Sequence, residues 1–179
     1  MIYLFLADGF EECEALAPLD ILRRAEIEIK TVGIGKIYIK GSHNIEISAD
    51  ITEKEIVLDE NLKGIILPGG MPGTLNLEKS DIVQKSIDFA VKNNLLISAI
   101  CAAPSILGHK NILNGRKATC FTGFEDDLLG AIVCDCPVVR DNNIITAYGA
   151  GAAFPFGFEL LSYLKGEDVA EKLKNQMRY

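Results

Sequence analysis

The chain has 179 residues, of which 49% are hydrophobic and 24% charged, and its formal net charge is −7. This length and composition predict a single domain over residues 1–179 with a sizeable core, and they exclude a disordered segment. The acidic balance without a long basic run argues against nucleic acid or an anionic membrane surface as a partner. The five cysteines are an odd number in a chain too large to need disulfides, so we expect a cytoplasmic protein.

The N-terminal part predicts a β-α-β unit followed by a hairpin. The continuous apolar run 2–7 is typical of a parallel strand buried on both faces, and it is too short to span a membrane. Residues 12–25 have the apolar spacing of a helix, and 27–35 form a second strand run. Residues 36–50 alternate around the turn Gly41-Ser42-His43-Asn44, which indicates a hairpin.

The remaining elements continue the alternation of strands and helices. Apolar runs at 62–70 and 95–100 predict buried strands on either side of a helix over 80–92, with Ser80 as its N-cap. Further patterns predict a strand near 116–120, a short helix around 123–130, hairpin strands near 137–140 and 144–147, an apolar helix at about 151–164, and an amphipathic helix after Gly166. We therefore expect an α/β fold with a mostly parallel sheet and helices on both faces.

Cys101 is the candidate reactive residue. It follows the buried run 95–100 directly and precedes a helix, so it lies at the carboxyl edge where open α/β sheets bind ligands. The nearby helix dipole predicts a lowered thiol pKa. The backbone N–H groups of Ala102 and of the turn at Gly69 and Gly70 could form an oxyanion site. On spacing alone, a small buried core cysteine is an equally good interpretation.

Four segments have, in order along the chain, the spacing of one known family. They are Asp8-Gly-Phe-Glu-Glu-Cys-Glu14 with Pro18-Leu-Asp20, Leu67-Pro-Gly-Gly70 with Gly73, Ala99-Ile-Cys-Ala-Ala-Pro104, and Gly149-Ala-Gly151 with Phe154 and Phe158. Together they resemble the ThiJ/PfpI superfamily and, within it, the DJ-one branch. The resemblance implies a flavodoxin-like three-layer sandwich, a homodimer, no metal or other cofactor, and a nucleophilic, redox-sensitive Cys101. It also implies that Glu14 hydrogen-bonds this thiol, with Gly70 and Ala102 as backbone donors.

The chain departs from the family at one position. Many active members carry a histidine shortly after the strand that follows the turn at the reactive cysteine. Residues 117–122 contain none, and Phe121 or its neighbour Cys120 takes that place. A Cys-His dyad and proteolysis are therefore not expected. Cys13, directly before Glu14, is interpreted as a core contact.

The other polar candidates have simple interpretations. Glu11 and Glu12 are expected to be solvated charges that could line the mouth of the site. His43 is expected to be solvated in the hairpin turn. Cys134 and Cys136 are interpreted as incidental loop cysteines, because two thiols without a second ligand pair are a weak zinc signal.

Two functions remain open. In the first, a glyoxalase- or deglycase-like enzyme uses Cys101 to attack a small reactive carbonyl or glycated adduct while Glu14 handles protons. In the second, an oxidative-stress sensor or redox-linked chaperone oxidises Cys101 to a sulfinate. The missing histidine favours the second relative to vigorous catalysis.

Overall fold

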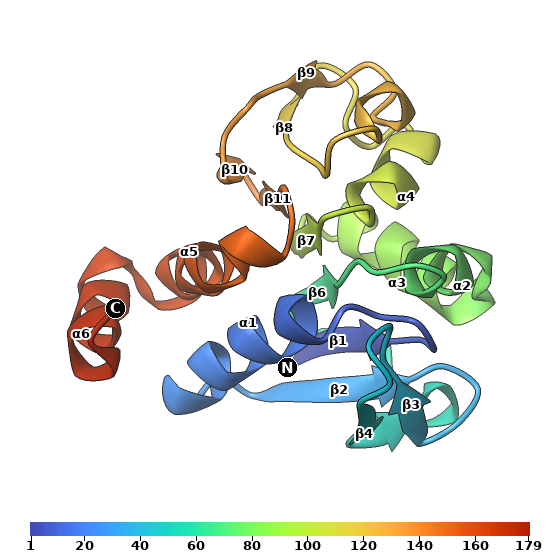
Figure 1. The fold of residues 1–179 in the computed structure, drawn as a ribbon, viewed down its shortest axis with the longest axis horizontal. Coiled ribbons are helices and arrows are strands. Elements are labelled where there is room, and N and C mark those ends of the chain that lie inside the picture. The colour runs from blue at the N-terminus through green and yellow to red at the C-terminus, as the bar shows by residue number, and fades with distance from the viewer.

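A seven-stranded sheet forms the middle layer of a computed structural model that describes residues 1–179 (Figure 1). Its strands are β1 (Ile2–Leu6), β2 (Ile29–Gly33), β5 (Ile51–Thr52), β6 (Gly64–Leu67), β7 (Leu96–Ile100), β10 (Val138–Asp141) and β11 (Ile144–Ala147). Across the sheet the order is β10-β11-β7-β6-β1-β2-β5. All neighbours pair in parallel except β10 and β11, which form the expected antiparallel hairpin.

Helices cover both faces of this sheet (Figure 1). One face carries α1 (Glu12–Arg24) and α5 (Ala153–Lys165), with α6 (Glu167–Met177) packed against α5. The other face carries α2 (Gly73–Lys79), α3 (Asp81–Lys92) and α4 (Pro104–His109). No helix is both long and apolar enough to cross a membrane.

Alternate residues of the central strands divide the core between the two faces. In β1, Leu4 and Leu6 belong to the core under α1 and α5, whereas Tyr3 and Phe5 belong to the core under α3 and α4. Every residue of β1, β6, β7 and β11 is buried, which is why the sequence shows continuous apolar runs and not alternation. The structure thus confirms a flavodoxin-like three-layer sandwich with a mostly parallel sheet.

Two small sheets lie outside the main one. The predicted hairpin is present as β3 (Tyr38–Lys40) and β4 (Glu46–Ser48). The strand expected near 116–120 is shorter, β8 (Lys117–Ala118), and it pairs in parallel with β9 (Ile132–Val133) instead of joining the main sheet. The helix expected around 123–130 is a single 3-10 turn over Glu125–Asp127.

Two details of the helices differ from the sequence interpretation. The helix α2 was not predicted, because its seven residues begin at Gly73 directly after Pro72 and look like a turn. Ser80 does occupy the N-cap position of α3, but its side chain makes no capping hydrogen bond. At α1 the capping side chain is Glu11, which accepts a hydrogen bond from the backbone N–H of Glu14 at 2.7 Å.

Candidate active site

The site forms where three neighbouring parallel strands end. Because β6 pairs with both β1 and β7, the loops that follow these strands meet at one edge of the sheet. The loop after β1 leads into α1 and carries Glu14, the loop after β6 carries Gly69 and Gly70, and β7 ends directly at Cys101.

The backbone at Cys101 is in an unusual conformation. Its φ is +66°, in the left-handed region that a residue with a side chain rarely adopts. Two hydrogen bonds hold it: its N–H donates to the Ala147 carbonyl at 2.9 Å, and its own carbonyl accepts from the Phe121 N–H at 2.9 Å. Such strain persists only where the surroundings enforce it, and it collects at functional sites. The thiol is half-buried at this turn.

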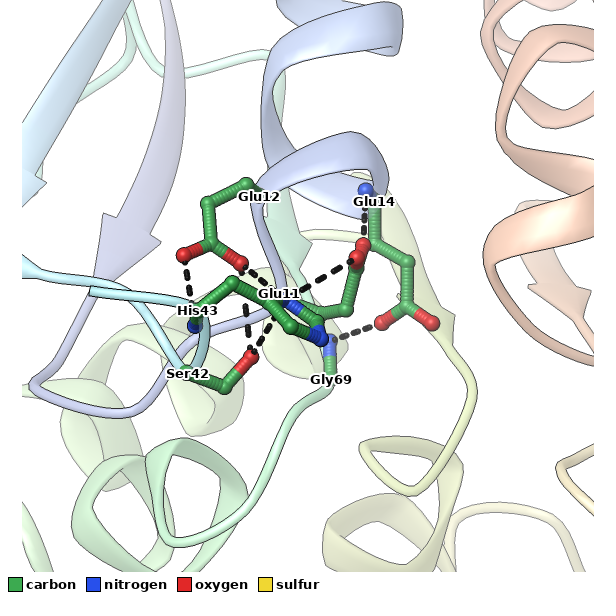
Figure 2. A network of polar contacts seen from close by, with 6 residues as sticks. All are labelled: Glu11, Glu12, Glu14, Ser42, His43 and Gly69. Atoms are coloured by element: carbon green, nitrogen blue, oxygen red, sulfur yellow. Dashed lines mark hydrogen bonds and ion pairs between the residues drawn. The ribbon is translucent and has the colours of Figure 1, made fainter. Parts of the chain in front are cut away.

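Glu14 meets this thiol from the first turn of α1. Its side chain is almost completely buried, at 1% exposure, and its carboxyl group lies beside Cys101. The Gly69 N–H donates to Glu14 Oε2 at 3.0 Å (Figure 2). The structure therefore brings Glu14 and Cys101 together, as the family resemblance implied.

Gly69 is the point at which the two groups converge. A Cβ atom built on Gly69 would lie 2.6 Å from Cys101 Cβ and 2.6 Å from Glu14 Oε2, so no side chain fits there. Its N–H is engaged by Glu14, and it is therefore not a free donor for a substrate oxygen. The backbone N–H groups of Gly70 and Ala102 instead act on Cys101, where they partly offset the rise in its pKa.

Burial controls the titration of the pair. It raises the pKa of Glu14 from 4.5 to about 7. Burial, followed by the charge of Glu14 and the hydrogen bond to it, raises the pKa of the Cys101 thiol to about 12. The expectation of a lowered thiol pKa is therefore wrong. The helix α4 has only six residues and begins three positions later, at Pro104, so its dipole and the two N–H donors do not outweigh burial beside a carboxylate.

The pKa values of both groups are raised, so the pair resists losing its second proton. Once the first proton has left, the pair carries one shared proton and one negative charge. The Gly69 N–H favours the charge on Glu14, whereas the N–H groups of Gly70 and Ala102 favour it on the sulfur of Cys101. A proton can therefore pass between the carboxyl group and the thiol without a change in total charge.

A second polar network ties the start of α1 to the β3–β4 hairpin. Glu12, 5% exposed, accepts from the His43 N–H at 2.8 Å through Oε1 and contacts His43 Nδ1 at 2.8 Å through Oε2. Figure 2 shows Glu12 turned toward Ser42 and His43, while Glu14 points away toward Gly69. The interpretation of Glu12 as a solvated charge is thus wrong, because the hairpin turn folds over its carboxylate.

This network also contains the only cluster with metal-binding geometry. The ligand atoms of Glu11, Glu12 and His43 all lie within 4.8 Å of one another. Both carboxylate oxygens of Glu12 already accept hydrogen bonds from the hairpin, which accounts for the cluster without an ion.

The remaining cysteines are free thiols. Cys13 is exposed, so its interpretation as a core contact is wrong: its neighbours Glu12 and Glu14 are buried, and it faces solvent between them. The charges of Glu11, Glu12 and Glu14, together with burial, raise the pKa of Cys13. Cys120 is buried in the core on the α3 and α4 side.

An apolar pocket of about 330 Å³ is lined by two segments that are held to Cys101 by backbone hydrogen bonds. Phe121, which lines it, donates its N–H to the Cys101 carbonyl, and Tyr148, which also lines it, follows Ala147, whose carbonyl accepts from the Cys101 N–H. From the sequence, Phe121 was identified only as the residue that replaces the family histidine, and Tyr148 was not identified. The position of Tyr148 directly before Gly149, in a segment that resembles the family, could have indicated it. A larger cavity, of about 710 Å³, lies elsewhere, near Asp8 and Asn76. It contains no thiol or histidine, so the chemistry is assigned to the Cys101 edge.

Comparison with known proteins places this geometry in a family. Residues 1–163 match the DJ-1/PfpI family. The chain is 30% identical to the Drosophila melanogaster protein dj-1beta over 173 residues, which cover 95% of this chain and 92% of that protein. It is 33% identical to the glutathione-independent glyoxalase DJ-1 of Schizosaccharomyces pombe over 177 residues, which cover 93% of this chain and 92% of the relative.

The fold shows the same relationship. The structure of oxidized Toxoplasma gondii DJ-1 superposes with a TM-score of 0.94 at 28% sequence identity, covering 99% of this chain and 97% of that one. The family match covers the loops that carry Glu14, Gly69 and Cys101. The chain therefore belongs to the DJ-1/PfpI family.

Proposed function

We propose that this protein converts small 2-oxoaldehydes, or their adducts, to 2-hydroxy acids, with Cys101 as nucleophile and Glu14 as the acid and base. The observation that carries this proposal is the buried Glu14 carboxyl group beside Cys101. A group with a pKa of about 7 can both take and return a proton at neutral pH. The name of the Schizosaccharomyces pombe relative, a glutathione-independent glyoxalase, supports the substrate class.

The proposed reaction balances without an external oxidant. The Cys101 sulfur bonds to the aldehyde carbon, and the thiol proton passes through Glu14 to the aldehyde oxygen, giving a hemithioacetal. Glu14 then takes the proton from this carbon and returns it to the neighbouring ketone carbon, while a hydroxyl proton moves from the former aldehyde oxygen to the ketone oxygen. The product is a thioester of the 2-hydroxy acid, which water hydrolyses to release the thiol. One carbon is oxidised and its neighbour is reduced within the same molecule.

Turnover of methylglyoxal to lactate tests the proposal. Cys101→Ala should abolish conversion, and Glu14→Gln should lower kcat by roughly 10²- to 10⁴-fold, the usual contribution of a general acid and base. Cys136→Ala removes an exposed cysteine outside the site and is the matched control. Equal rates for the wild-type protein and Cys101→Ala would refute the proposal.

A second function is supported by the same surroundings of the sulfur. The N–H groups of Gly70 and Ala102 and a protonated Glu14 are suited to hold a sulfinate, formed from the thiolate and two equivalents of peroxide with release of water. This would suit a redox sensor or a redox-linked chaperone. The raised thiol pKa slows such oxidation, because the thiolate is the reactive form. Mass spectrometry after mild peroxide should find two added oxygens at Cys101 alone, whereas oxidation spread over all five cysteines would count against this function.

A further inference from the structure

The apolar pocket beside Cys101 has a composition that restricts what can occupy it. Its lining consists of Phe121, Thr122, Tyr148, Gly149, Ala150 and Gly151. None of these residues carries a charge at neutral pH. Its volume of about 330 Å³ is at the small end of the range for small-molecule sites, which begins at roughly 300 Å³.

Backbone hydrogen bonds tie the walls of this pocket to Cys101. The Phe121 N–H donates to the Cys101 carbonyl at 2.9 Å, and the Cys101 N–H donates to the carbonyl of Ala147, the residue before Tyr148, at 2.9 Å. The segments that carry the two aromatic residues are therefore both held to the backbone of Cys101. The Phe121 ring lies against Gly149, where an added Cβ atom would approach Cδ2 to 3.1 Å.

Both rings leave much apolar surface uncovered at this place. Phe121 is 50% exposed and Tyr148 is 39% exposed. Neither ring belongs to an aromatic pair: the pairs in the structure are Tyr3–Phe5, Phe154–Tyr179 and Phe158–Tyr179. An aromatic ring gains both apolar burial and ring–ring contact on such a surface, whereas a methyl group gains only a small part of the burial.

We propose that this site prefers 2-oxoaldehydes that carry an aromatic ring, and that Phe121, together with Tyr148, binds the ring. This inference rests on the proposed function, which supplies the attack of Cys101 on an aldehyde carbon. In an aryl 2-oxoaldehyde a single carbonyl carbon separates the ring from the aldehyde. A ring held in a pocket whose walls are hydrogen-bonded to Cys101 is therefore compatible with an aldehyde placed at the sulfur. Phe121, which stands where many family members carry a histidine, is a specificity residue here and not a proton carrier.

The turnover test compares phenylglyoxal with methylglyoxal. The ratio of kcat/KM for phenylglyoxal to that for methylglyoxal should fall by about threefold to tenfold in Phe121→Ala, the size of an aromatic pair contribution. Phe154→Ala removes an aromatic side chain that is similarly exposed, at 45%, and does not line the pocket, so it should leave the ratio unchanged. An unchanged ratio in Phe121→Ala, with turnover still dependent on Cys101, would overturn the inference and leave the proposed function standing.

A second measurement does not depend on turnover. In this experiment Cys101 is alkylated with 2-bromoacetophenone and, separately, with bromoacetone. The first reagent carries a phenyl group where the second carries a methyl group, as do the two substrates. Each alkylation rate is divided by the rate of the same reagent with free cysteine. The normalised ratio should favour the aromatic reagent in the wild-type protein and fall about threefold to tenfold in Phe121→Ala. If neither oxoaldehyde is turned over but this ratio behaves as expected, the proposed function fails and the ring site is supported. If the ratio is the same in both proteins, the ring site is refuted.

Discussion

Glu14 changes its affinity for a proton when the chain folds. Its carboxyl group titrates at 4.5 when solvated and at about 7 when buried beside Cys101. Between these values the folded protein binds a proton that the unfolded chain has released. The resulting contribution to stability is fully present below pH 4.5 and is lost as the pH rises through about 7. The reactive site thus destabilises the neutral-pH fold.

Glu14→Gln should remove this pH dependence. The free energy of unfolding of the variant, relative to wild type, should increase by about 3 kcal/mol between about pH 4 and about pH 8, since each pKa unit corresponds to about 1.4 kcal/mol. Urea unfolding at a series of pH values measures it. Glu46→Gln changes an exposed carboxylate in β4 and should show no such trend. Parallel curves for the two variants would show that Glu14 titrates normally.

At the scale of elements, the junction of α1 with the β3–β4 hairpin depends on Glu12. Burial alone would raise the pKa of Glu12, but the hydrogen bonds from His43 outweigh it and the pKa is lowered. The side-chain hydrogen bond to Glu12 raises the pKa of His43 in turn. The hairpin itself was predictable from its alternating residues and turn sequence. Its carboxylate partner was not, because Glu12 is distant in sequence and belongs to a different pattern.

Glu12→Ala should loosen the hairpin without unfolding the sheet. Losing the hydrogen bonds to a buried carboxylate should cost about 2 kcal/mol, and the freed His43 amide should exchange its hydrogen faster. Hydrogen exchange of the hairpin amides, read by NMR, measures this effect. Glu46→Ala, in the same hairpin but exposed, is the control. Unchanged exchange at His43 would mean that the hairpin is held by other contacts.

At the scale of the molecule, stability depends on a sheet that separates two cores. The central strand β6 lies between β1 and β7, and its residues divide between the faces: Ile66 packs under α1 and α5, and Ile65 under α3 and α4. The loop that carries Gly69 and Gly70 begins where this strand ends. Its position therefore depends on both cores being intact.

Ile66→Ala should destabilise the whole protein by about 2–5 kcal/mol, because Ile66 is fully buried and its removal leaves a cavity. Ile45→Ala, at a position 52% exposed, should change stability by no more than about 0.5 kcal/mol. Urea unfolding followed by far-ultraviolet circular dichroism distinguishes the two. Similar costs for both variants would contradict the assignment of Ile66 to the core.

The homodimer implied by the family resemblance stays a prediction that sedimentation velocity would test.

The amino-acid sequence by itself determined which segments become buried strands and placed Cys101 after one of them. Hydrophobic periodicity is a local property, and it is preserved whatever the partners of a segment are. Only the tertiary structure decided the strand order, the contact between Glu14 and Cys101, the buried position of Glu12 and the apolar pocket at Phe121. It also reversed the expected shift in the pKa of the Cys101 thiol, which is raised and not lowered. A pKa depends on desolvation and on charges brought from distant parts of the chain, and neither is encoded in the spacing of residues around Cys101.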